Sequence, residues 1–250
     1  VLVVAFCCCN IGSVYGTDSE TTNDGQQGNT TYKLTYFNAR FRAECARLIF
    51  AQAGVPYEDN RISHEEWEKI KPSAIFCLPS IKNERIEVRS STPFGHLPLL
   101  EFDGNQLGES YAINRYLART FGLAGNSSLE EAYIDSIASS FKDFFESTIK
   151  AVRALARKEN VNASTMETID KARGQFMPPL QKFLDKAGSG YVVGKSLSWA
   201  DLLITEYLAT IQSVIPDFLK NYPTVEKYVN DVRKLPNIAK WLEERPKTPY

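Results

Sequence analysis

The pattern of apolar and polar positions changes its period several times along the chain. Residues 33–37 alternate as a short strand does, and residues 42–53 then carry apolar side chains at helical spacing, which Gly54 ends. Residues 57–62 predict a second strand, and 64–70 predict a short helical or irregular segment. Since a helix separates the two strands, we expect them to be parallel. This order predicts an α/β unit.

A hairpin and another helix follow further along. Residues 97–102 predict a strand, Asp103-Gly104 predicts a two-residue turn, and 106–107 predict the returning edge strand. Ser110 begins a helix that we expect to run through Phe121. Together with the first unit, these elements predict a mixed sheet with helices in a domain over residues 32–121.

The remainder of the chain has a helical pattern. Residues 122–128 are expected to link the domains, and apolar positions recur at helical spacing through 129–250. Ser198-Trp199-Ala200-Asp201 is a capping box, in which Ser198 caps a helix and Asp201 reaches back to it. We therefore expect an all-α C-terminal domain, with a structural role for this box.

The N-terminal segment has a different composition. Residues 1–9 are apolar, a small-residue stretch ends at Gly16, and 17–31 are polar without apolar periodicity. We interpret 1–16 as a secretory signal peptide and 17–31 as a disordered extension. The alternative for the apolar run is a buried strand. The chain lacks an initiator Met and a basic segment before the apolar run, so we expect the signal to be truncated.

Composition narrows the classes of function. The hydrophobic fraction of 43% over 250 residues is enough for a substantial core. The net charge of −1 gives no electrostatic reason to expect nucleic acid or an anionic membrane as a partner. No stretch after residue 20 approaches the roughly 18 apolar residues of a membrane span.

Glycosylation triplets and cysteines bear on the compartment. Asn29, Asn126 and Asn162 each begin an Asn-X-Ser/Thr triplet, which agrees with a secreted, extracellular glycoprotein. After signal cleavage only Cys45 and Cys77 remain, too few for a disulfide scaffold. Cys45 is expected in the core, and the state of Cys77 is open.

Sequence motifs in a fixed order carry a family resemblance. They are Tyr-Lys-Leu-Thr-Tyr-Phe-Asn at 32–38, Pro-Phe-Gly-His-Leu-Pro-Leu-Leu at 93–100 and Gly-Glu-Ser-Tyr-Ala-Ile-Asn-Arg-Tyr-Leu at 108–117. Together they resemble the sigma class of glutathione S-transferases, which includes the glutathione-dependent prostaglandin D synthases. The resemblance runs from Tyr32 to the C-terminus. It implies an α/β thioredoxin-like N-terminal domain followed by an all-α C-terminal domain, the glutathione S-transferase fold.

The segment at about 72–91 departs from that family. Relatives pass from the lysine matched by Lys71 to the Pro-Phe-Gly motif within a few residues, whereas this chain spends about twenty. The insert could be a lid-like loop beside the site, or it could be an artefact of splicing or gene prediction.

A candidate for thiol activation is Tyr36. A cysteine-type thiol has a pKa near 8.5, so only a few per cent is thiolate at pH 7, and a hydroxyl that donates a hydrogen bond to sulfur favours the anion. The resemblance makes Tyr36 the catalytic tyrosine and Arg42 the arginine that packs beneath its ring and lowers its pKa. Without the resemblance, Tyr36 would be read as a partly buried core tyrosine.

The resemblance also assigns the glutathione contacts. Ser110, at a helix start suited to anions, is expected to bind the γ-glutamyl carboxylate, and Glu109, where relatives carry Gln, could pair with the γ-glutamyl amine. Leu97 precedes a cis-proline and offers its backbone to the tripeptide. The remaining expected contacts are Pro98, Trp67, Lys71 and, from the partner subunit of a homodimer, Asp143.

The resemblance predicts a glutathione transferase that conjugates glutathione, its co-substrate, to hydrophobic electrophiles, with prostaglandin H2 isomerisation to D2 as a further activity. No metal site is expected, because Ser139 and Lys142 replace the acidic cluster of vertebrate prostaglandin synthases. A non-catalytic carrier or crystallin-like protein is the alternative. The expected electrophile pocket, whose residues could equally be core, comprises Phe37, Ala39, Phe41, Phe145 and Ile149.

Overall fold

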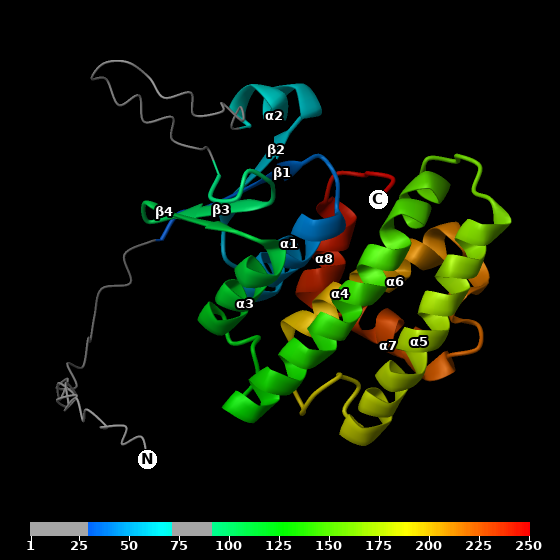
Figure 1. Cartoon of the computed structure of the whole chain (residues 1–250). Helices are drawn as coiled ribbons and strands as arrows, with labels where there is room; N and C mark the ends of the chain where they lie inside the picture. Colours follow the sequence, from blue (N-terminus) through cyan, green and yellow to red (C-terminus); the bar gives the residue numbers. More distant parts are fainter. Residues whose placement is uncertain (1–29, 72–91) are drawn as a thin grey trace, which may run out of the picture. The chain divides into compact units, whose positions relative to one another are not determined.

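The computed structural model describes residues 30–71 and 92–250 (Figure 1). Its first part contains a four-stranded sheet in the order β2-β1-β3-β4, in which β1 and β2 are parallel and the other pairs are antiparallel. The elements of this part are β1 (Tyr32–Phe37), α1 (Phe41–Ala53), β2 (Tyr57–Ile62), α2 (His64–Ile70), β3 (Leu99–Phe102), β4 (Asn105–Gly108) and α3 (Ser110–Thr120). The predicted parallel pairing and α/β architecture are confirmed.

Local sequence explains where these elements end. Gly54 adopts φ 66° and its N–H closes the last turn of α1, a conformation that glycine reaches without a steric penalty. Asp103 and Gly104 both have positive φ, as the two-residue turn between β3 and β4 requires. The strand predicted over 97–102 begins only at Leu99, because Pro98 has no N–H to contribute to a strand ladder.

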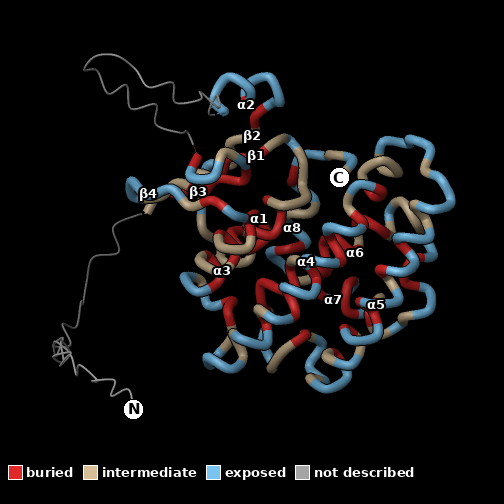
Figure 2. Tube along the Cα trace, viewed as in Figure 1, coloured by how far each residue is buried: buried red, intermediate tan, exposed pale blue. Residues whose placement is uncertain are grey.

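The second part is helical, as predicted. It consists of α4 (Ser128–Ala156), α5 (Ala163–Ala187), α6 (Trp199–Val214), the 3₁₀ helix η1 (Pro216–Leu219), α7 (Pro223–Arg233) and α8 (Pro236–Glu244). Helix α6 is buried along most of its length and packs against α4, α7 and α1 (Figure 2). The expected capping box is present at its start, where Asp201 accepts hydrogen bonds from the N–H and hydroxyl of Ser198.

Buried ion pairs join the two parts. On α1, Glu44 accepts from Arg47 at 3.0 Å and from Arg245, which follows α8, at 2.8 Å. Arg245 also donates to Glu206 of α6 at 2.8 Å, and Arg40 donates to the same carboxylate at 3.0 Å. This cluster, which we call the Glu44–Glu206 network, fixes the loop between β1 and α1 against the helical part.

Several predictions lie outside the described residues: the signal peptide, all but residues 30 and 31 of the disordered extension at 17–31, the insert at 72–91, Asn29 and Cys77. Within the described ranges, no helix combines the length and apolar character that crossing a membrane would require.

Candidate functional site

Tyr36 lies near the end of β1 and is 7% exposed. Burial raises the pKa of its hydroxyl above the usual value of about 10, and this effect outweighs the charge of Arg42 and a hydrogen bond with the Arg42 backbone, which both lower it. The hydroxyl is therefore protonated at neutral pH and able to donate a hydrogen bond to an anion.

A guanidinium that lies over the face of the Tyr36 ring belongs to Arg47, which the sequence did not indicate. The Arg47 guanidinium lies 6.0 Å from the ring centroid, and it also donates to the Ala39 carbonyl at 2.7 Å. Arg42 instead makes a bidentate pair with Glu146 of α4, at 2.7 and 2.9 Å, and lies over the Phe145 ring. Arg42 thus lowers the Tyr36 pKa through charge and backbone, while its side chain points toward α4.

A cavity of about 350 Å³ brings together many of the residues predicted to contact glutathione. It is lined by Arg42, His96, Leu97, Pro98, Glu109 and Ser110. The Leu97–Pro98 peptide bond is cis, as expected. Ser110 is the first residue of α3, so unpaired backbone N–H groups and the positive end of the helix dipole favour an anion there.

The Glu109 side chain lies beside His96, which was not predicted to contact glutathione. Its carboxylate is 2.7 Å from Nε2 of His96, and both side chains are exposed. Glu109 itself adopts φ 65°, an uncommon conformation for a residue with a side chain. His96 and Glu109 are 13 positions apart in the sequence. Their spacing therefore gave no indication that the two side chains meet.

Trp67 lies on α2 and Lys71 directly follows that helix, and neither is among the residues that line this cavity. Trp67 is buried and meets the Phe37 ring edge-on at 6.4 Å, and Phe37 also packs on His64 at 4.3 Å. Lys71, at the end of α2, is exposed beside Glu68 at 3.8 Å. The structure thus places Phe37, predicted in the electrophile pocket, against α2, and its role in that pocket is not supported by these contacts.

Asp143 is exposed on α4 in a separate hollow of about 270 Å³, together with Ser140, Ser147 and Gln175. It does not line the cavity at Ser110 within this chain. The contact of Asp143 with glutathione from a partner subunit stays a prediction.

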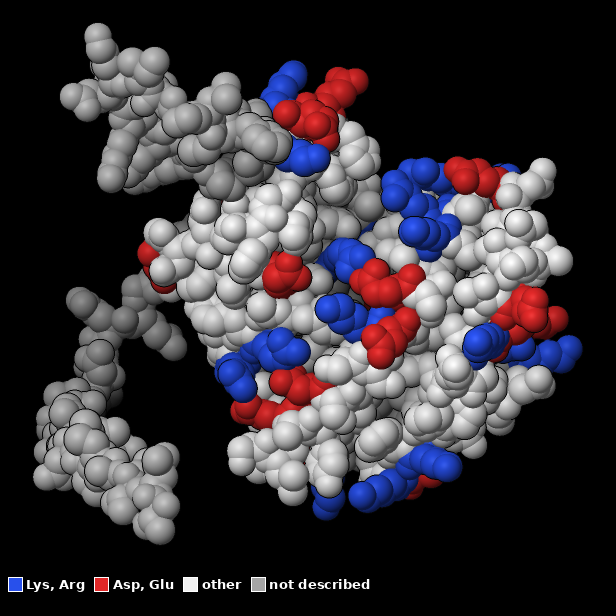
Figure 3. Space-filling view, viewed as in Figure 1, with Lys and Arg blue, Asp and Glu red and all other residues white. Residues whose placement is uncertain are grey.

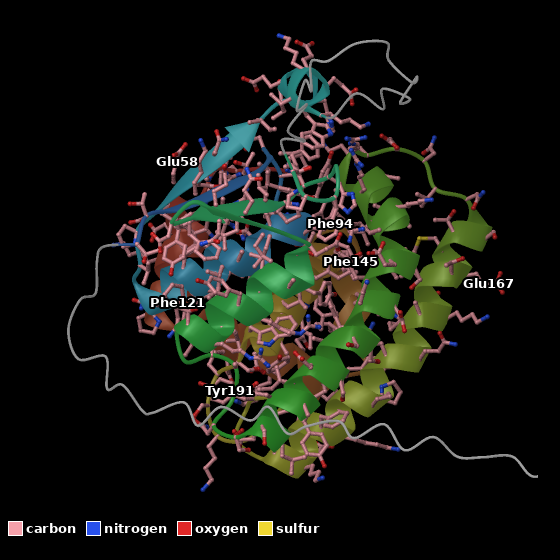
Figure 4. All side chains as sticks on the ribbon, turned by 60° about the vertical axis from the view of Figure 1, so that its left-hand side comes forward. Glu58, Phe94, Phe121, Phe145, Glu167 and Tyr191 are labelled. Carbon is pink, nitrogen blue, oxygen red and sulfur yellow. The ribbon has the colours of Figure 1, made fainter. Side chains whose placement is uncertain are left out.

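The predicted electrophile pocket is nearly filled. Phe41 and Phe145 lie edge to face at 6.3 Å and border a space of only about 20 Å³ (Figure 4 shows Phe145 where α4 passes α1). Tyr250 stacks on Phe41 with ring centroids 4.7 Å apart. Ala39 and Ile149 pack against the core nearby. Tyr250 was missed because nothing in its local sequence indicates contact with residue 41.

Among the described residues, Cys45 is the one cysteine. Cys45 is buried, its thiol contacts the Trp199 carbonyl at 3.5 Å, and burial raises its pKa well above the usual range. In the described ranges, no cluster of three or more His, Cys, Asp or Glu side chains is arranged to hold a metal ion. The absence of a metal site stays a prediction.

The remaining two glycosylation triplets lie at helix starts. Asn162 caps α5, its side chain accepting from the Thr165 N–H at 2.9 Å. Asn126 borders a cavity of about 520 Å³ between α4 and the end of α5, which also includes Tyr133 and Phe183. That cavity is larger than the one at Ser110, but none of the predicted glutathione contacts lines it.

Comparison with known proteins places this geometry in a family. Residues 142–245 match the family described as glutathione S-transferase, C-terminal domain. The chain is 50% identical to glutathione S-transferase 1 of Ascaris suum over 221 residues, 88% of this chain and 98% of that protein. It is 40% identical to glutathione S-transferase 4 of Caenorhabditis elegans, over 86% of this chain and 96% of that protein.

Solved structures agree with the sequence relatives. The glutathione S-transferase from Ascaris lumbricoides has a TM-score of 0.77 at 50% identity, covering 88% of this chain and 100% of that one. The prostaglandin synthase D of Nilaparvata lugens has a TM-score of 0.69 at 31% identity, covering 87% and 100%. The chain belongs to the glutathione S-transferase family, and the predicted fold, a thioredoxin-like domain followed by a helical domain, is confirmed.

Proposed function

We infer that this protein is a glutathione transferase that joins the glutathione thiolate to hydrophobic electrophiles. The observation that carries this inference is the buried, protonated Tyr36 hydroxyl at the end of β1, in a chain 50% identical to a named glutathione S-transferase. Arg42 connects Tyr36 with the cavity at Ser110, because its backbone contacts Tyr36 and the residue also lines the cavity.

In the proposed reaction, the glutathione thiol loses its proton to solvent, and the Tyr36 hydroxyl donates a hydrogen bond to the resulting thiolate sulfur. This hydrogen bond stabilises the thiolate relative to the thiol, so a larger fraction is reactive at neutral pH. The sulfur then forms a bond to the electrophilic carbon, and the leaving group departs with its electron pair. Because the Tyr36 pKa is raised, the residue acts as a neutral donor rather than as a tyrosinate base.

We propose that the γ-glutamyl carboxylate binds at the start of α3, on the Ser110 hydroxyl and backbone N–H groups. The Leu97 backbone beside the cis-proline would pair with the cysteinyl unit, as an added strand does. Trp67, on α2, and Lys71, directly after α2, would contact the glycine carboxylate.

We propose a further activity for the same thiolate. Its sulfur attacks one endoperoxide oxygen of prostaglandin H2 and breaks the O–O bond; loss of the C11 proton then forms the ketone of prostaglandin D2, breaks the S–O bond and returns the thiolate. The likeness to the prostaglandin synthase of Nilaparvata lugens, at 31% identity, supports this proposal. Incubation of the protein with prostaglandin H2 and glutathione would test it; a product distribution equal to that without protein would contradict it.

We also propose a homodimer and a secreted, glycosylated chain. Phe94 is 62% exposed in the loop before the cis-proline, a position suited to burial against a second copy (Figure 4). Asp143 is exposed on α4 and is not among the residues that line the cavity at Ser110, so it is available to a second copy. Sedimentation equilibrium would reveal a monomer if the dimer is wrong.

Expression in a secreting eukaryotic cell would test secretion, since glycosidase treatment of the medium must then shift the protein's mass.

Glutathione binding and turnover together test the proposed activity. The protein should be retained on immobilised glutathione and should conjugate a simple aryl halide. Tyr36→Phe should keep most of its retention but lose activity, whereas Ser110→Ala should lose retention first. Retention without turnover in the unmutated protein would favour the non-catalytic carrier, and absence of both would favour a crystallin-like scaffold.

A further inference from the structure

The Tyr250 side chain lies in a small site built from separate parts of the chain. Phe41, at the start of α1, stacks on its ring at 4.7 Å with an angle of 20° between the planes. The guanidinium groups of Arg153, in the last turn of α4, and of Arg157, the residue after that helix, lie 5.5 and 5.2 Å from the same ring. The Tyr250 hydroxyl accepts a hydrogen bond from Nε of Arg157 at 2.9 Å. An aromatic ring bearing an oxygen is thus held between an aromatic face and two cations.

The positive charge at this site is poorly balanced by carboxylates. Arg40, which donates to the Pro249 carbonyl, is paired with Glu206. Among carboxylates of the described residues, Arg157 pairs only with the exposed Glu159, at 3.9 Å. Arg153 forms no ion pair with any described residue, and its Nε is buried without a hydrogen-bond partner there. Figure 3 shows basic side chains gathered at this end of α4, close to the C-terminus marked in Figure 1.

This cationic site is close to the proposed reaction centre. Arg153 is near enough to Tyr36 for its charge to lower the pKa of the Tyr36 hydroxyl. Phe41, which stacks on Tyr250, also meets Phe145 in the predicted electrophile pocket. A molecule bound against Phe41 with an anionic group on Arg153 and Arg157 would therefore lie beside the thiolate that Tyr36 stabilises.

We propose that Arg153 and Arg157 select aromatic electrophiles that carry a carboxylate, and that such an electrophile displaces the Tyr250 side chain from the face of Phe41. The inference rests on the proposed transferase function and specifies its substrate class. With an aryl chloride, the glutathione sulfur forms a C–S bond to the ring carbon, and the C–Cl bond breaks with loss of chloride and its electron pair. The carboxylate is unchanged by the reaction and contributes binding alone.

A matched pair of substrates tests this proposal in the full chain: a chlorodinitrobenzoate and the corresponding neutral benzamide. Both have the same ring and leaving group, so they differ at the carboxylate. We expect a lower KM for the benzoate. Arg153→Met and Arg157→Met should each raise that KM by about tenfold, as loss of a charge-assisted hydrogen bond does, with less than about a threefold change for the benzamide. Arg157→Lys should restore part of the preference.

The matched control is Lys150→Gln, which removes one positive charge from an exposed position of the same helix and should leave the preference intact. Tyr250→Phe frees Arg157 from the tyrosine hydroxyl and should lower the KM for the benzoate. Turnover of both substrates with equal KM would overturn this substrate proposal and leave the transferase function standing. A preference for the benzoate that survives both arginine substitutions would do the same. If neither substrate is turned over, the transferase function fails and this inference fails with it.

Discussion

At the scale of single residues, Tyr36 shows how burial decides a chemical role. Desolvation raises the pKa of the hydroxyl, and Arg42, Arg47 and Arg153 offset this only in part. A tyrosine with a lowered pKa could remove the thiol proton as a base. With a raised pKa, Tyr36 keeps its proton and favours the thiolate by hydrogen bonding.

This difference predicts the dependence of the conjugation rate on pH. In the unmutated protein, kcat/KM should rise with pH as bound glutathione ionises, with a midpoint below the usual thiol pKa of about 8.5. Tyr36→Phe should move that midpoint upward by about one pH unit or more, since a hydrogen bond to a charged group contributes about 1.5–3 kcal/mol. Because the Tyr36 pKa is raised, its ionisation should reduce the rate only above about pH 10. A midpoint that is the same in both proteins would contradict the donor role.

At the scale of secondary-structure elements, the start of α6 depends on one carboxylate. Asp201 is fully buried and accepts hydrogen bonds from Ser198, from the Val192 N–H at 2.9 Å and from the Tyr228 hydroxyl at 3.0 Å. Burial raises the pKa of Asp201, although each of these hydrogen bonds lowers it. The box therefore ties α7 and the loop before α6 to the helix, beyond its local capping.

Asp201→Ala should lower the free energy of unfolding by about 3 kcal/mol, because it leaves several buried donors without an acceptor. Urea denaturation followed by circular dichroism would measure the loss. Ser127→Ala removes the exposed cap of α4, where Ser127 accepts from the Glu130 N–H at 3.2 Å, and should cost about 1 kcal/mol. If both variants lose the same free energy of unfolding, the hydrogen bonds of Asp201 to Val192 and Tyr228 do not stabilise the fold beyond the helix cap itself.

At the scale of the whole described molecule, the Glu44–Glu206 network holds the sheet part against the helical part. Arg47 has no exposed side-chain surface, and Glu44 is 1% exposed. Trp241 of α8 donates to Glu44 at 2.9 Å, and Arg233 of α7 pairs with Glu206. The network thus sets the position of the start of α1, where Phe41 and Arg42 lie.

Glu206→Gln should destabilise the protein by about 3 kcal/mol, because removing one charge from a buried cluster leaves its partners uncompensated. Chemical denaturation would measure this change. The comparison variant Glu131→Gln breaks a pair with Arg119, which is largely exposed, and should cost less than about 1 kcal/mol. A loss of that small size for Glu206→Gln would mean that the network is not a determinant of stability.

The same network predicts sensitivity to acid. Burial opposes ionisation of Glu44, but Arg47 and Arg245 outweigh it and lower the Glu44 pKa below its ordinary value of 4.5. Because the Glu44 pKa is lower in the folded chain than in the unfolded chain, its ionised form stabilises the fold. This stabilisation is complete at pH values above the pKa of the unfolded chain, and it is lost as pH falls through the pKa of the folded chain. Thermal unfolding from pH 6 to pH 3 should therefore show a smaller loss of stability below about pH 4.5 in Glu44→Gln than in the unmutated chain.

The sequence by itself determined the elements and the order in which they occur. Alternation at 33–37, the helix pattern ended by Gly54, the Asp103-Gly104 turn and the Ser198–Asp201 box all act over a few residues, so local physics fixes them. Tyr36, Leu97, Pro98 and Ser110 could be chosen because they belong to motifs that resemble a known family.

Only the tertiary structure decided which distant residues meet. It placed Arg47 over the Tyr36 ring, set His96 against Glu109, turned Phe37 toward α2 and brought Tyr250 onto Phe41. Each contact depends on how helices pack and where charges find partners across the fold. Such contacts have no periodic signal along the chain, because the residues involved are separated by up to 209 positions, from Phe41 to Tyr250.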